Sequence, residues 1–224
     1  DLLDRANNLL VMDTLDSRER IEEHLDGLID ERLLTCYASD CRFLVAKPSI
    51  RSMEEDLACV FAEGRKSNPH FNETNALECE VIGIAPKLNS EQLAAVLTTA
   101  WHSVSLISGG AGSGKTFTID ALTRLCESRD LRVVLCAPTG KAARRMEEST
   151  GRPASTIHRL LGFNGKTYAR DSDNPIAADV LVVDEASMID VPLAWRLFNA
   201  IDLARTCVVL VGDHHQLPPV GPRN

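Results

Sequence analysis

The fold is decided by the stretch Val104-Ser105-Leu106-Ile107-Ser108-Gly109-Gly110-Ala111-Gly112-Ser113-Gly114-Lys115-Thr116. An apolar run rich in β-branched residues stops at a glycine-dense loop, and a Lys-Thr pair then opens a predicted helix. The spacing is G-x-x-x-x-G-K-[ST] in a strand–loop–helix setting, which is typical of phosphate-binding loops.

The chemistry of this loop follows from its residue types. Glycine lets the backbone wrap closely around phosphate, because a Cβ would clash or forbid the required dihedrals. The loop N–H groups and the positive end of the next helix then point at an anion. Lys115 is expected to reach the β- and γ-phosphates, and Thr116 to place its hydroxyl on Mg²⁺. The residues expected to cradle the phosphates are Gly109, Gly110, Ala111, Gly112, Ser113 and Gly114. A chance glycine-rich turn is the alternative, and the flanking elements argue against it.

Composition bounds the class of protein. The 224 residues fit one or two domains, and a hydrophobic content of 44% with 4% aromatic residues predicts a sizeable aliphatic core. The net charge of −8 argues against a simple cationic nucleic-acid binder. Residues 1–80 carry 18 acidic and 9 basic side chains, whereas residues 129–170 carry 9 basic and 3 acidic ones. A polyanion is therefore expected to bind the second region.

The seven cysteines are predicted to be reduced and largely buried, because none forms a C-x-x-C pair. A zinc site at Cys36 and Cys41 is the alternative, although no second ligand pair follows at zinc-site spacing. No apolar run reaches transmembrane length and no signal peptide is visible, so we expect a cytoplasmic protein. The abrupt first and last residues favour a fragment of a longer chain.

Residues 1–47 predict a small module of helices followed by a two-stranded hairpin, which is a winged-helix-like arrangement. Its main helix is acidic and would repel DNA phosphates, so packing or partner docking is favoured over DNA binding. Residues 48–87 are expected to be a connector, with a helix from Ser49 to Lys66 and irregular structure over 70–87.

A second domain is predicted over residues 88–224. Four short apolar strands, at 104–108, 131–137, 180–183 and 208–211, alternate there with helices, one of which is a short helix over residues 155–161. This alternation predicts an α/β fold with a parallel sheet and helices on both faces. Ligands bind such sheets at the carboxyl ends of the strands. We predict one site there, because a strand precedes each polar residue of interest: Lys115, Thr139, Asp184, Glu185, Asp213 and Gln216.

Two adjacent carboxylates follow the apolar strand at 180–183. A buried charge must be paired or bound to metal, so this placement indicates chemistry. Asp184 suits the Mg²⁺ shell, and Glu185 suits positioning and deprotonating an attacking water. The alternative is that both carboxylates cap the following helix.

The last strand leads into Gly212-Asp213-His214-His215-Gln216. Gln216 is expected to hydrogen-bond a γ-phosphate or the attacking water. A metal site at the two histidines is the alternative, but adjacent histidines rarely face one ion and a solvated loop is favoured.

The basic region offers candidates for binding a phosphate backbone. The helix after Gly140 presents its N-terminal N–H groups and Lys141, and Thr139 and His158 lie near it. A solvated helix face with ion pairs to Glu147 and Glu148 is the better explanation from composition alone.

Several segments together resemble the RecD-like branch of superfamily 1 DNA helicases. Residues 109–116 resemble helicase motif I, 137–143 motif Ia, 155–161 the next DNA-contacting segment, 183–188 motif II and 212–221 motif III. Asn89 to Gln92 resembles the adenine-recognising Q motif of that family. The acidic module before it resembles, more loosely, the region preceding the motor in the longer RecD-like proteins.

The resemblance implies a P-loop NTPase with a RecA-like sheet that uses ATP and Mg²⁺ to move 5′ to 3′ on single-stranded DNA. It implies a role in DNA repair or recombination, with subunits of a recombination or exonuclease V complex as further partners. Lys115, Glu185 and Gln216 would be catalytic, Gln92 would read adenine, and Thr139, Lys141 and His158 would contact DNA.

The resemblance also sets a limit and leaves alternatives. Residues 88–224 match the first motor domain only, and the second, with its arginine finger, is not among them. We therefore expect the isolated chain to bind ATP–Mg²⁺ weakly and to hydrolyse it little, since an arginine finger contributes about 10³ to 10⁵ in rate. The alternatives are the helicase half of a conjugative relaxase and a nucleotide-gated docking module without turnover.

Overall fold

The structure is a computed structural model that describes residues 24–39, 42–64, 68–71, 75–110, 112–213 and 216. The chain divides into two compact units, residues 1–55 and 56–224. The predicted boundaries at residues 47 and 87 remain predictions. No helix in the described part of the chain is long and apolar enough to cross a membrane.

The first unit contains the predicted hairpin. Residues 24–30 are helical, and β1 (Thr35–Ser39) pairs antiparallel with β2 (Arg42–Ala46), with Thr35 opposite Ala46. The helix predicted to start at Ser17 lies partly outside the described residues. Helix α3 (Pro48–Glu63), predicted from Ser49, begins in this unit and ends in the second one.

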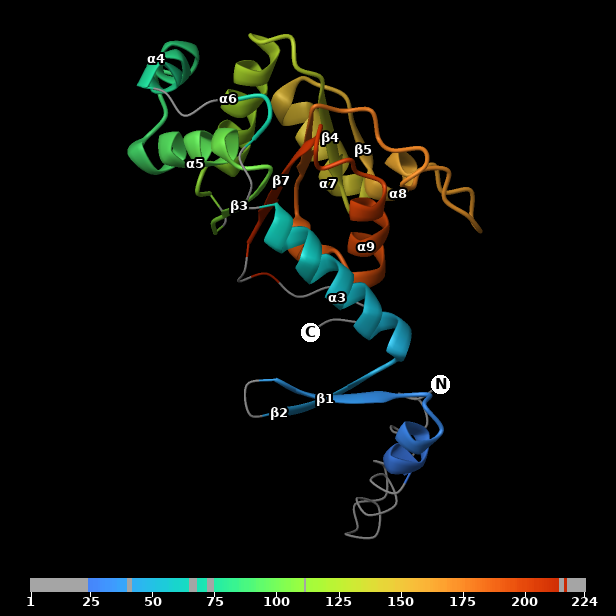
Figure 1. The fold of residues 1–224 in the computed structure, drawn as a ribbon. Helices are drawn as coiled ribbons and strands as arrows, with labels where there is room; N and C mark the ends of the chain where they lie inside the picture. The colour runs from blue at the N-terminus through green and yellow to red at the C-terminus, as the bar shows by residue number, and fades with distance from the viewer. Residues whose placement is uncertain are drawn as a thin grey trace. The chain divides into compact units, whose positions relative to one another are not determined.

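The second unit is an α/β fold, as predicted (Figure 1). Its parallel sheet has the order β3-β7-β6-β4-β5, with bounds β3 (Val104–Ser108), β4 (Val133–Ala137), β5 (Ala154–Thr156), β6 (Val180–Val183) and β7 (Cys207–Gly212). The helices are α4 (Asn75–Ile84), α5 (Ser90–Trp101), α6 (Lys115–Glu127), α7 (Gly140–Thr150), α8 (Ile157–Leu160), the 3₁₀ turn η1 (Ala186–Met188) and α9 (Val191–Asn199).

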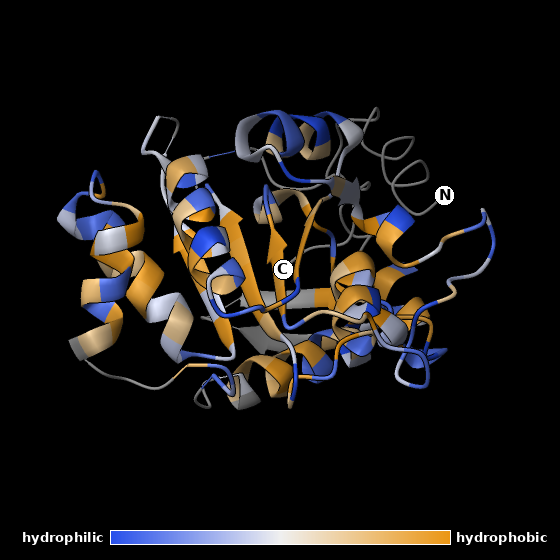
Figure 2. Ribbon diagram, turned by 90° about the horizontal axis from the view of Figure 1, so that it is seen from above, coloured by the Kyte–Doolittle hydropathy of each residue, from blue (hydrophilic) through white to orange (hydrophobic). Residues whose placement is uncertain are grey.

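Both faces of the sheet are buried at the central strands β6 and β7, where successive residues point to opposite sides. At the edge strand β3, by contrast, Leu106 is 69% exposed. In β6, Val180 and Val182 pack into a core with α4, α5 and α6, while Leu181 and Val183 pack into a second core with α8 and α9. Figure 2 shows these hydrophobic strands between the two layers of helices. The buried thiol of Cys136 belongs to this core, and burial raises its pKa to about 12. Of the six cysteines among the described residues, Cys126, Cys136 and Cys207 are buried, but Cys36, Cys59 and Cys79 are exposed, so the prediction of burial is wrong for these three.

Three predictions about secondary structure were wrong. Part of the segment predicted to be irregular is helical, because residues 75–84 form α4, which buries Leu77 and Val81 at helical spacing. The sheet has five strands rather than four, since three residues of β5 suffice to pair with β4. Ser155 and Thr156 therefore belong to a strand, and only the residues after them form a helix.

Residues predicted to be a connector contribute to the core of the second unit. The end of α3 packs on α9, where Phe61 meets Phe198 edge to face with ring centroids 5.1 Å apart. The indole Nε1 of Trp195 donates a hydrogen bond to Asp56 over 2.8 Å. Residues 56–64 and 75–84 are thus integral to this unit.

Candidate functional site

The phosphate loop joins the carboxyl end of β3 to the start of α6. Its first amide, Gly109 N–H, donates to the carbonyl of Gly212 over 3.2 Å, which ties the loop to the end of β7. Gly114 must be glycine, because its φ of +80° is left-handed and a Cβ would lie 2.3 Å from the Gln92 amide. Ala111 lies outside the described residues.

Lys115 is the first residue of α6 and bends back over the loop. Its Nζ donates hydrogen bonds to the carbonyl oxygens of Gly109 and Gly110, the second over 2.9 Å. The positive charge therefore lies at the mouth of the loop, at the N-terminus of a 13-residue helix. Thr116 follows on the exposed side of the first turn. This arrangement places a cation, a hydroxyl and a helix N-terminus together, which favours an anion.

The two carboxylates after β6 do not cap a helix. Asp184 Oδ1 accepts from the N–H of Glu185 over 2.9 Å, and Glu185 makes no side-chain cap. Helix α9 is capped instead by Asp190, which accepts from the N–H of Leu193. The capping alternative therefore fails for Asp184 and Glu185.

Both the backbone and the side chain of Glu185 are in an energetically unfavourable arrangement. Its φ of +52° is left-handed, which costs a residue with a Cβ about 1 kcal/mol or more. Its Oε2 atom is buried and has no hydrogen-bond partner among the described residues. Strain and an unpaired buried carboxylate oxygen do not stabilise a fold, and they cluster at functional sites.

Asp184 is partly buried beside Glu185. Burial is the main reason that the pKa of Asp184 is raised, and the charge of Glu185 adds to it. The hydrogen bond from Glu185 N–H and the charges of Lys115 and Arg145 oppose the rise. The carboxylate therefore needs positive charge nearby to stay ionised at low cost.

These groups line one pocket of about 670 Å³. It is bounded by the phosphate loop, the first turn of α6, one face of α7 and the carboxylates after β6. The predicted site residues on its wall are Gly110, Gly112, Ser113, Gly114, Lys115, Thr116, Asp184, Glu185 and Gln216. The carboxyl ends of the strands thus bring these nine residues to one pocket, whereas Thr139 and Asp213, predicted for the same site, do not line it.

Arg145, which lies in the basic region of residues 129–170, is also a pocket residue. The structure places it on the pocket wall, whereas its neighbour Arg144 pairs with Glu148 over 2.9 Å. Helical spacing is the signal that identifies it, because Ala142, Met146 and Ser149 lie on the same face and also line the pocket.

Gln92, in the first turn of α5, contacts the phosphate loop but does not line the pocket. It forms a capping box with Asn89, accepting from the Asn89 N–H over 3.1 Å and donating from its backbone N–H to Asn89 Oδ1 over 2.8 Å. Its side-chain Nε2 donates to the carbonyl of Ser113 over 3.3 Å. The amide is therefore fixed against the loop by two neighbours.

The predicted DNA-contacting residues lie along the same edge of the sheet. Ala137 pairs with Thr156 in the β4–β5 register, so Thr139 and His158 follow two residues after paired positions. Thr139 caps α7 by accepting from the N–H of Ala142 over 3.2 Å. Lys141 and His158 are exposed.

Among the described residues, no group of three His, Cys, Asp or Glu is placed to hold an ion. Cys41, His214 and His215 lie outside the described residues. For Mg²⁺, the Thr116 hydroxyl and the Asp184 carboxylate on one pocket wall are the oxygen donors that this ion prefers. The residues present therefore fit the ion.

A family model described as an AAA domain matches residues 92–222, more than half of the chain. The chain belongs to this AAA domain family. The matched range contains the phosphate loop, the carboxylates and Gln216.

Curated relatives agree with the predicted RecD-like resemblance. The chain is 46% identical over 133 residues to the ATP-dependent RecD2 DNA helicase of Deinococcus radiodurans, covering 59% of this chain and 18% of that protein. It is 40% identical over 155 residues to the RecBCD enzyme subunit RecD of Haemophilus influenzae, covering 58% and 24%. The chain thus spans about a fifth to a quarter of these relatives. The predicted relationship to RecD-like helicases is confirmed.

Among solved structures, the chain is similar to the Pif1 helicase of Candida albicans. The identity is 26% and the TM-score 0.42, covering 60% of this chain and 34% of that one.

Proposed function

We propose that this chain is the first motor domain, with its preceding module, of an ATP-dependent DNA helicase that moves 5′ to 3′ on single-stranded DNA. The observation that carries the proposal is the single pocket in which Lys115, Asp184, Glu185 and Gln216 meet. The names of the RecD and RecD2 relatives support DNA as the substrate and a RecBCD-like complex as a partner. A cytoplasmic role in DNA repair or recombination accords with this proposal.

Each pocket residue has a proposed role. The loop amides and the Lys115 ammonium bind the phosphates of ATP. Thr116 and Asp184 would hold Mg²⁺, which supplies neutralisation of phosphate charge when bound. Glu185, whose Oε2 has no hydrogen-bond partner among the described residues, orients a water and takes its proton. Gln216 hydrogen-bonds the terminal phosphate or that water.

DNA stimulation is proposed to arise at the edge of the sheet that carries Thr139, Lys141 and His158. All three lie at the carboxyl ends of β4 and β5 or in the helices that follow. We also propose that residues 1–224 alone hydrolyse ATP slowly, because an opposite wall with an arginine is required for the full rate.

The experiment is Glu185→Gln in the whole protein, measured as ATP binding and as ATPase rate with and without single-stranded DNA. Binding should be retained, and the DNA-stimulated rate should fall by about 10² to 10⁴, the usual contribution of a general base. A matched control is Asp190→Asn, which leaves the cap of α9 intact. A Glu185→Gln protein that hydrolyses ATP normally would contradict the assignment, and a wild-type protein that binds ATP without DNA stimulation would be a docking module.

A further inference from the structure

Three aromatic rings gather where α8 runs into the loop after it. The ring centroid of Phe163 lies 5.5 Å from that of His158 and 4.7 Å from that of Tyr168. His158 and Tyr168 are 6.2 Å apart. We call this group the aromatic platform. Phe163 is 40% exposed and His158 is exposed, whereas Tyr168 is half-buried against the second core, so the platform is open to solvent at two of its three rings.

The backbone holds the aromatic platform in place. The N–H of Phe163 donates to the carbonyl of His158 over 2.9 Å. The N–H groups of Ala169 and Arg170 both donate to the carbonyl of the fully buried Leu161, which folds the loop back on α8. The rings are therefore fixed before a ligand arrives, which lowers the entropy lost on binding.

One guanidinium lies against the platform. The guanidinium of Arg196 lies over the Tyr168 ring, 5.4 Å from its centroid. Arg159 and Lys166 adjoin the rings in sequence, and within the described chain neither of them nor Arg196 forms an ion pair. The acidic groups of the loop are Asp171 and Asp173, and the Asp171 carboxylate accepts the N–H groups of residues 173 and 174. A ligand with flat apolar rings and negative charge fits this surface.

We propose that His158, Phe163 and Tyr168 form a stacking platform for one unpaired base of single-stranded DNA, with Arg159, Lys166 and Arg196 facing its phosphates. The inference rests on the proposed function and assigns a mode of binding to the edge of the sheet. Exposed rings beside unpaired cations are how proteins hold single strands without reading sequence. An aromatic cluster that served only to pack the loop would not leave Phe163 two-fifths exposed.

The test compares two strands that differ only in their bases. Fluorescence anisotropy measures the affinity for an oligothymidylate and for an abasic strand of equal length and charge. Wild type should bind the thymidylate more tightly than the abasic strand. Phe163→Leu should bind the thymidylate roughly 5- to 150-fold more weakly than wild type does, since stacking contributes about 1–3 kcal/mol per base. Its affinity for the abasic strand should stay unchanged.

The matched control is Phe61→Leu. Phe61 is 41% exposed and also pairs edge to face with another ring, but it lies on α3 against α9. This variant should bind both strands like wild type. A second measurement needs no variant: photocrosslinking of a strand carrying 5-iododeoxyuridine should label the peptide of residues 157–170.

Two results would overturn the aromatic platform. One is a wild type that binds both strands equally. The other is crosslinking confined to a different peptide. Failure of the helicase proposal appears separately, in the ATPase of the Glu185→Gln protein, so a DNA-stimulated ATPase with no base preference would reject the platform alone.

Discussion

The side-chain amide of Gln92 donates a hydrogen bond to the carbonyl oxygen of Ser113 in the phosphate loop, over 3.3 Å. Its oxygen accepts the backbone N–H of Asn89 over 3.1 Å. An amide has two donors and an acceptor with two lone pairs, so one N–H and one lone pair remain. The remaining N–H matches the N7 acceptor of adenine, and the remaining lone pair matches its N6 donor.

Gln92→Ala should therefore remove the preference for ATP over GTP. Guanine offers two acceptors on the same edge, so the amide discriminates against it by about 1–3 kcal/mol. The measurement is competition between the two nucleotides. Asn89→Ala is the control, because it removes the capping partner and leaves the amide: some helix stability should be lost while the preference remains. If the Gln92→Ala protein still prefers ATP, Gln92 stabilises the phosphate loop and does not recognise adenine.

The edge of the sheet could be predicted from sequence because of its periodicity. Short apolar runs such as Val180–Val183 are explained in an α/β chain as buried strands of a parallel sheet. The residues that follow these strands therefore lie together at the carboxyl edge of the sheet. Lys115, Asp184, Glu185 and Gln216 were placed together on that basis, and the structure brings them to one pocket.

What sequence could not supply is the state of the side chains. The left-handed backbone of Glu185 and its unpaired Oε2 depend on how η1 packs, and no local pattern encodes them. Arg145 and Arg144 are adjacent and chemically alike, so only the helix phase separates the pocket residue from the paired one. The aromatic platform joins α8 to a loop without regular structure, and periodicity carries no information there.

Arg145→Ala is expected to weaken nucleotide binding, whereas Arg144→Ala is not. Arg145 lines the pocket, and its charge lowers the pKa of Asp184. Losing one cation from a partly buried phosphate site should lower the affinity roughly tenfold, or about 1.4 kcal/mol. Binding of a fluorescent ATP analogue measures both variants. If both variants lose the same affinity, the loss comes from the lower net positive charge of the protein and not from the position of Arg145 in the pocket.

Asp184→Asn should raise stability while removing Mg²⁺-dependent nucleotide binding. The raised pKa means that the fold disfavours the ionised carboxylate, so the stability linked to this group is present at low pH and is lost as pH rises through its folded-state pKa. The variant should melt roughly 2–4 °C higher at pH 7, the response of a chain this size to about 1 kcal/mol. The difference should shrink as pH falls toward the ordinary aspartate pKa. Asp190→Asn, which exchanges one good cap for another, should leave the melting temperature unchanged. A lower melting temperature for Asp184→Asn would contradict the cost assigned to burial.

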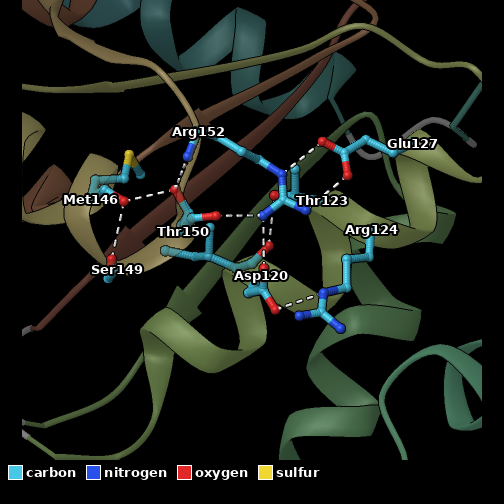
Figure 3. Close-up of polar contacts among 9 residues, drawn as sticks. Asp120, Thr123, Arg124, Glu127, Met146, Ser149, Thr150 and Arg152 are labelled. Atoms are coloured by element: carbon cyan, nitrogen blue, oxygen red, sulfur yellow. Dashed lines mark hydrogen bonds and ion pairs between the residues drawn. The ribbon is translucent and has the colours of Figure 1, made fainter.

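Arg152 is expected to stabilise the second unit by joining the segment after α7 to α6. Its guanidinium meets Asp120 at 2.7 Å and both oxygens of Glu127 at 2.7 and 2.8 Å, and it donates to the carbonyl of Thr150 at 2.9 Å (Figure 3). The side chains of Arg152 and Asp120 are only 20% and 18% exposed, so water cannot fully replace these bonds.

Arg152→Met should therefore lower the free energy of unfolding by about 1–2 kcal/mol, because charged hydrogen bonds are lost while the apolar stem is kept. Urea denaturation measures it. Arg144→Met is the matched control: its pair with Glu148 is 80% and 63% exposed, and such pairs contribute at most about 1 kcal/mol. Arg152 precedes β5, which leads to His158, and its partners Asp120 and Glu127 lie on α6, which starts at the phosphate loop. The bonds of Arg152 therefore also connect these two elements. An Arg152→Met protein as stable as the Arg144→Met protein would mean that these bonds form in the folded state without stabilising it.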